Sequence, residues 1–95
     1  MVANSFRTIE KEEIEDLKFP SIEVLTNSSS IIEREAELKR AMALGNLEHG
    51  KIKIYFEDDQ TCYMVETTVW GVTDKRVILK QGVVIPIQRI HAIKI

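Results

Sequence analysis

Apolar and polar residues alternate most regularly in the second half of the chain. In Lys51–Glu57 the isoleucines and the phenylalanine occupy every second position, which is typical of a half-buried strand. Further runs rich in β-branched residues follow, separated by residues that favour turns. These runs are Thr61–Val72, Arg76–Lys80, Val83–Ile85 and His91–Ile95. We therefore predict five short strands in this half of the chain.

The second run, Thr61–Val72, is long for a strand, and Gly71 interrupts it near its end. A glycine at this position indicates a bulge or a sharp bend, so we expect one long strand that bends there. Alternation places Cys62 and Trp70 on the same face, which we expect to be core or barrel rim. Cys62 is accordingly expected to be a buried structural thiol. Pro86 should end the fourth strand, because proline has no N–H for the ladder.

A helix is predicted before the strands, over residues 31–44. Ser30 and Glu33 have the spacing of a capping box at its start. Good helix formers fill the segment, and Gly45 followed by Asn46 supplies a left-handed stop. The predicted apolar face holds Ile31, Leu38, Ala41 and Met42.

The first part of the chain is acidic and sparse in apolar residues. The sequence is compatible with two structures for this part: a marginal helix from Ile9 to Lys18 capped by Thr8, or a mobile tail. Pro20 would end such a helix. Because apolar groups are few, we expect the N-terminal acidic segment and linker, residues 1–29, to be partly mobile or docked on a partner. Residues 30–95, the helix plus the strands, are expected to form a single domain.

This order of elements resembles the Sm-like fold, a small SH3-like barrel. The features that match are the helix 31–44, the first strand 51–57, the bent second strand 61–72 and the ending 84–93. The chain is also similar to small bacterial proteins of the Bacteroidetes type, without assigned activity, that share the Glu-Thr-Thr-Val-Trp core found at Glu66–Trp70. The resemblance implies a mainly β fold: a five-stranded, strongly bent antiparallel barrel with an N-terminal helix.

Two loops depart from the pattern of Sm-like RNA binders. Those proteins usually carry Asp-x-apolar-Asn after the bent strand, whereas this chain reads Thr-Asp-Lys-Arg-Val at Thr73–Val77. They carry Arg-Gly or Lys-His between the last two strands, where this chain has Ile87-Gln88-Arg89. The residues with which the family reads bases are therefore absent.

Composition sets outer limits on the function. The chain has 95 residues, a formal net charge of −2 and 44% hydrophobic residues, as expected for one soluble globular domain. No stretch approaches the roughly 18 apolar residues of a membrane span, and the N-terminus lacks the apolar run of a signal peptide. With one cysteine, no intramolecular disulfide can form. We expect a cytoplasmic protein without a membrane partner.

No catalytic residues, metal ligands or cofactors are predicted. His49 and His91 are 42 residues apart, and no carboxylate stands at a metal-binding spacing from either. The glycines are singly placed, so there is no phosphate-binding loop. We therefore expect a protein that is not an enzyme.

Two kinds of function remain. The first is a small binding module, with a regulatory or adaptor role, that binds a protein partner or a second copy of itself. The second is binding of RNA or single-stranded nucleic acid through basic barrel loops, with Trp70, Tyr55 and Tyr63 as stacking faces. The candidate residues for nucleic-acid binding are Lys75, Arg76, Lys80 and Arg89.

Overall fold

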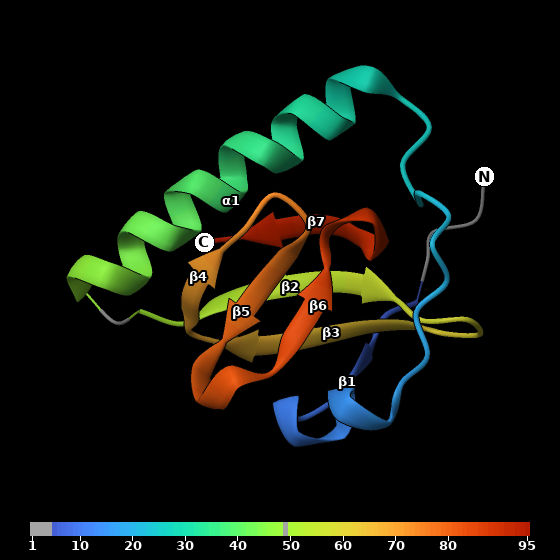
Figure 1. Ribbon diagram of the computed structural model, residues 1–95, viewed down its shortest axis with the longest axis horizontal. Helices are drawn as coiled ribbons and strands as arrows, with labels where there is room; N and C mark the ends of the chain where they lie inside the picture. Colours follow the sequence, from blue (N-terminus) through green and yellow to red (C-terminus); the bar gives the residue numbers. More distant parts are fainter. Residues whose placement is uncertain (1–4, 49) are drawn as a thin grey trace.

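The computed structural model, which describes residues 5–48 and 50–95, has one α-helix beside two β-sheets (Figure 1). The four-stranded sheet has the order β1-β3-β2-β7, and the three-stranded sheet the order β4-β5-β6. The strands are β1 (Arg7–Thr8), β2 (Ile52–Glu57), β3 (Cys62–Thr67), β4 (Val69–Val72), β5 (Arg76–Leu79), β6 (Val84–Pro86) and β7 (Ile90–Lys94). The helices are α1 (Ser28–Glu48) and the 3-10 helices η1 (Lys11–Asp16), η2 (Lys80–Gly82) and η3 (Ile87–Arg89).

The core lies between the two sheets. Figure 1 shows β5 and β6 crossing in front of β2 and β3 at a steep angle. Every second residue of β2 is buried, which confirms the strand predicted from the alternation there. The largest fully buried side chains come from both sheets and from η1: Ile14, Ile52, Ile54, Phe56, Val65, Val69, Val77, Leu79, Ile85 and Ile90.

The chain passes from the first sheet to the second at Thr68, between β3 and β4. Thr67, Thr68 and Val69 are all buried, so the alternation of faces breaks where the chain turns. Gly71 lies inside β4, and the register with β5 shifts between Val69 and Gly71, which confirms the predicted bulge. The expected single strand bending at Gly71 is wrong, because the break between sheets comes three residues earlier.

The face of β3 and β4 that carries Trp70 points outward. Val65 and Val69, on the opposite face, are buried in the core, whereas Trp70 is 54% exposed. Of the two expectations for the face with Cys62 and Trp70, the core is therefore wrong for Trp70, and the barrel rim stays a prediction. Alternation defines two faces of a strand, but the supply of apolar side chains from the second sheet decides which of them is buried.

Helix α1 is longer at both ends than the predicted 31–44. The Asn27 side-chain oxygen accepts a hydrogen bond from the Ser29 amide (2.7 Å), so Asn27 caps the helix and the predicted Ser30 capping box is wrong. The helix also continues through Gly45 to Glu48, so the predicted stop is wrong. A glycine inside a helix costs about 1 kcal/mol relative to alanine, which packing of the helix elsewhere offsets.

The N-terminal segment lies against the rest of its own chain. Strand β1 pairs parallel to β3, with Arg7 opposite Tyr63. Ile14 in η1 is 1% exposed and belongs to the core, so the premise that this region is too polar to pack is wrong. In place of the helix that the sequence allows over residues 9–18, the structure has a shorter 3-10 helix. Thr8 lies in β1 and does not cap it. Mobility of the segment, or its docking on a partner, stays a prediction.

The two sheets do not close into a ring of paired strands among residues 5–48 and 50–95. Within these ranges β6 pairs with β5 alone and β7 with β2 alone. Helix α1 packs beside β4 and β7, one edge strand of each sheet (Figure 1). The predicted combination of an N-terminal helix with a bent, mainly antiparallel β-structure is confirmed to this extent. In the described part of the chain, no helix is both long and apolar enough to cross a bilayer.

Arg34 fastens α1 to two other parts of the molecule. Its two terminal nitrogens each donate to a carboxylate oxygen of Glu23 at 2.7 Å, and one of them also donates to the Ile90 carbonyl at 2.9 Å. The guanidinium is buried, so the pair joins the segment before the helix, the helix and β7. The hydrogen bonds from Arg34 lower the pKa of the Glu23 carboxyl below its ordinary value of 4.5.

This pair makes a pH-dependent contribution to stability. Because the pKa of Glu23 is lowered in the folded state, the contribution is present above pH 4.5 and is lost as the pH falls through the folded-state value. We expect Glu23→Gln to lower stability at neutral pH and to lose less stability than the wild type on acidification below pH 4.5. Urea unfolding at stepped pH measures this, with the exposed Glu35→Gln as control. Equal acid sensitivity of wild type and Glu23→Gln would contradict it.

Candidate functional site

The outer face of the three-stranded sheet carries an apolar patch, which we call the Trp70 face and define by Trp70, Ile78 and Val84. Ile78 lies directly opposite Gly71 on one side and Val84 on the other, so these three positions share a face, and Trp70 is the extra residue of the bulge directly before Gly71. Trp70 is 54% exposed and Val84 41% exposed, although both are large apolar residues. Gly71 has no side chain to cover Ile78, and a Cβ there would meet the Ile78 Cδ1 at an ordinary 3.8 Å.

Three of the four predicted cations lie at the two ends of β5. Lys75 and Arg76 are exposed at its start, and Lys80 is exposed directly after its end. The Thr73 hydroxyl accepts from the Lys75 amide (3.2 Å) and the Arg76 amide (2.9 Å), which gives the loop before β5 a defined shape. Cations therefore stand at both ends of the strand that carries Ile78.

Arg89, the fourth predicted cation, is 6% exposed and does not join the other three. Its Nε donates to the Glu57 carbonyl (3.2 Å), and its terminal nitrogens donate to the carbonyls of Ile22 (2.6 Å) and Asp58 (2.9 Å). These carbonyls lie in the N-terminal segment and at the β2–β3 turn. Arg89 therefore holds the fold together instead of facing a ligand.

The three aromatic residues predicted as stacking faces also differ in exposure, as the four cations do. Tyr63 is buried, and Tyr55 packs against the ring of Phe6 with centroids 5.0 Å apart and planes at 77°. Of the three aromatic residues singled out in the sequence, Trp70 alone presents an exposed ring.

A second cluster, which the sequence did not indicate, joins Glu57, Cys62 and His91. The His91 Nε2 lies 2.8 Å from Glu57 Oε1, and the Cys62 thiol lies 3.8 Å from the same oxygen. Burial and then the Glu57 carboxylate raise the pKa of the Cys62 thiol. The three residues are 5 and 34 positions apart, so no local spacing signals their convergence. Cys62 is half-buried, whereas the sequence predicts a buried thiol.

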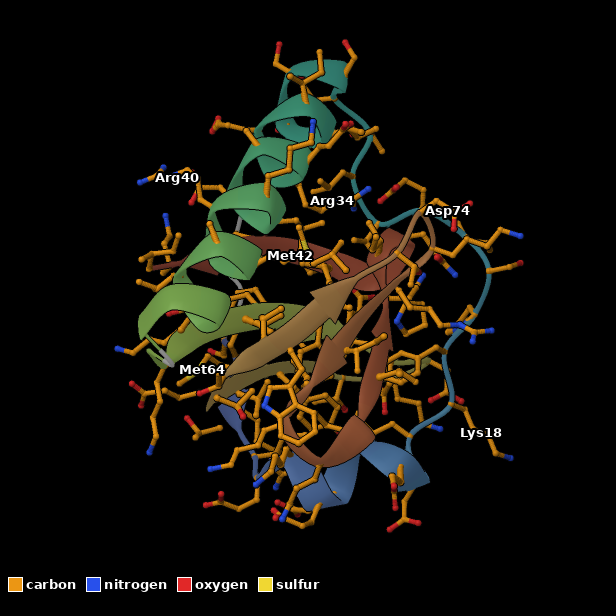
Figure 2. All side chains as sticks on the ribbon, turned by 60° about the vertical axis from the view of Figure 1, so that its left-hand side comes forward. Lys18, Arg34, Arg40, Met42, Met64 and Asp74 are labelled. Atoms are coloured by element: carbon orange, nitrogen blue, oxygen red, sulfur yellow. The ribbon has the colours of Figure 1, made fainter. Side chains whose placement is uncertain are left out.

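A groove of about 500 Å³ lies between α1 and the loop that joins β4 to β5. Figure 2 shows Arg34 and Met42 on the helix and Asp74 on this loop. Leu38 and Ile87 contribute further apolar walls. Three residues of the predicted apolar face of α1, Ile31, Leu38 and Met42, line this groove.

No family model matches this chain, and neither does any curated protein or solved structure. Functional conclusions therefore rest on the geometry of the described residues. Two features stand out among the described residues: the Trp70 face, where Trp70 and Val84 are exposed, and the cluster of Glu57, Cys62 and His91, whose ligand atoms lie within 4.8 Å of one another.

Proposed function

We propose that the protein is a non-enzymatic binding module that binds another protein through the Trp70 face. The observation that carries this proposal is the exposure of Trp70, the chain neighbour of Gly71, whose partner Ile78 lies opposite the exposed Val84 on the outer sheet face. Exposed contiguous apolar patches mark interaction sites. Tryptophan and arginine are also the residue types that most often dominate the binding energy of protein interfaces.

We also propose that the module is an Sm-like, SH3-like small barrel. The strand orders β7-β2-β3 and β4-β5-β6 support this, as does the chain's passage between sheets at Thr68. The single turn η3 between β6 and β7 is a further feature in its favour.

The composition of the Trp70 face favours one kind of partner. Arg76 and Lys80 stand at the ends of an apolar strip, so an apolar segment flanked by acidic residues matches it in both charge and polarity. Single-stranded nucleic acid usually stacks its successive bases on several aromatic rings. Here Trp70 is the one exposed ring among the three candidate stacking residues, because Tyr63 is buried and Tyr55 packs against Phe6. The exposed cations keep nucleic acid as the second candidate.

The test uses the fact that Trp70 is the one tryptophan of the chain, so its fluorescence reports on this face. Peptides selected from a display library against the wild-type protein should be apolar with acidic flanks, and they should shift the emission to shorter wavelength. We expect Trp70→Ala to weaken binding of a selected peptide about 30-fold, the effect of losing about 2 kcal/mol at a hot spot. Calorimetry measures this loss, since the variant has no tryptophan signal.

Ile32→Ala is the matched control, because Ile32 is an exposed apolar residue of α1 outside this face. It should bind the peptide as the wild type does. Equal binding by Trp70→Ala would refute the proposed site. Binding of oligonucleotides instead, with affinity that falls steeply with salt, would favour the second candidate. Loss of concentration-dependent dimers in Trp70→Ala would identify a second copy of the chain as the occupant.

A further inference from the structure

We propose that Glu57, Cys62 and His91 form a binding site for a divalent transition-metal ion of the zinc class. This site lies on the four-stranded sheet and does not depend on the function proposed for the Trp70 face. Each ligand comes from a different strand, and the three strands, β3, β2 and β7, are adjacent. One carboxylate oxygen, the thiol sulfur and one ring nitrogen all lie within 4.8 Å of one another.

The pairing of the strands explains why these side chains meet. Glu57 and Cys62 are directly opposite each other in the β2–β3 ladder, so they share a face. In the β2–β7 ladder Phe56 pairs with Ile90 and Tyr55 with Ala92, which leaves His91 as an extra residue in a bulge. A bulge re-aims a side chain, and His91 turns toward Glu57 on the outer face.

The distances already approach those of a metal site. Metal–ligand bonds of about 2.0–2.3 Å in a tetrahedron place the ligand atoms roughly 3.3–3.8 Å apart. The Cys62 sulfur lies 3.8 Å from Glu57 Oε1, and the His91 nitrogen lies 2.8 Å from it. A bound metal requires the second distance to open by less than an ångström and the sulfur–nitrogen distance, which is at most 4.8 Å, to lie in the same range. All three residues are half-buried, so we expect water to supply the fourth ligand.

The surroundings orient the ligands. Arg89 lies 3.6 Å from Glu57 Oε2, so the other oxygen, Oε1, is the one turned to the cluster. The ring of Phe6 packs edge-on against His91 with centroids 5.7 Å apart and shields one side. The positive charge of Arg89 opposes a bound cation. The carboxylate and the thiolate together supply two negative charges, which outweigh it.

The donor set selects the kind of metal. Thiolate and imidazole favour zinc and similar ions, whereas magnesium and calcium prefer oxygen ligands. On binding, the Cys62 thiol transfers its proton to solvent and the sulfur bonds to the metal. The bound state thus replaces the Cys62–Glu57 and His91–Glu57 contacts by three bonds to one ion.

Cobalt(II) titration of the protein without an affinity tag tests the site, because a cobalt–thiolate bond gives a near-ultraviolet charge-transfer band. We expect one equivalent of cobalt to bind with this band, and zinc to displace it. Cys62→Ser should abolish the band. His91→Gln and Glu57→Gln should each weaken binding at least tenfold. Magnesium at the same concentration should leave the spectrum unchanged.

Two matched controls separate this site from adventitious binding. His49→Gln removes the other histidine, and Glu66→Gln removes an exposed carboxylate of β3 further along the same face. Both should bind cobalt within twofold of wild type. Zinc should also raise the thermal midpoint of wild type but not of Cys62→Ser, which reports on binding without the cobalt spectrum. A band that survives in Cys62→Ser, or absence of stoichiometric binding by folded wild type, would overturn the proposal.

Discussion

Replacement of Arg89 by alanine is expected to lower the free energy of unfolding by about 3–5 kcal/mol, the usual cost of removing one member of a buried charged network. Arg89 donates to three backbone carbonyls, of Ile22, Glu57 and Asp58, and is 6% exposed. Its loss leaves these acceptors without their donors in a site where water enters poorly. A chain of this size has a free energy of unfolding of about 5–14 kcal/mol, so the variant should retain little of its stability.

Urea unfolding measures this loss, and two further variants define its cause. Arg89→Lys keeps the charge but cannot reproduce the planar fork of donors, so we expect an intermediate loss of about 1–3 kcal/mol. Lys80→Ala removes an exposed cation at the end of β5 and should change stability by less than about 0.5 kcal/mol. A loss in Arg89→Ala no larger than in Lys80→Ala would show that Arg89 is not part of the folded framework.

Replacement of Ile14 by alanine should lower the free energy of unfolding by about 2–4 kcal/mol, the range for a buried isoleucine truncated in a packed core. Ile14 is 1% exposed, although it belongs to the 3-10 helix η1 in the acidic N-terminal segment. This side chain is the main apolar anchor of that segment, so the cavity left by the substitution also weakens its attachment.

Ile22→Ala is the matched control, because Ile22 is 73% exposed in the same segment. It should change stability by less than about 0.5 kcal/mol. If Ile14→Ala is as mild as Ile22→Ala, the segment does not pack on its own chain in solution. That outcome would favour the mobile or partner-docked segment expected from the sequence.

Local pattern accounts for much of the fold. The alternation in β2 predicts its bounds to within one residue, and the turn residues place β5, β6 and β7 within one. These features follow from interactions between near neighbours. The sequence predicts the bounds of α1 less well, because Asn27 and Ser30 both offer capping side chains at its start and Gly45, which favours a stop, lies inside the helix.

The candidate sites depended far more on contacts between distant parts of the chain. Turn positions in the sequence place the three exposed cations around β5, whereas nothing local predicts the burial of Arg89, because a buried arginine leaves no signature in the sequence. Nothing in the spacing of Glu57, Cys62 and His91 predicts that they meet, since a register and a bulge bring them together.

The sequence by itself determined the periodicity: most of the segments that are strands in the second half of the chain, the approximate position of the helix and which positions share a face. Tertiary structure decided which of the two faces is buried: Val65 and Val69 are in the core, whereas Trp70 is exposed. The physical reason is that periodicity is set by the backbone geometry of each element alone. Burial and the convergence of side chains are set by the element packed against it and by the register between strands.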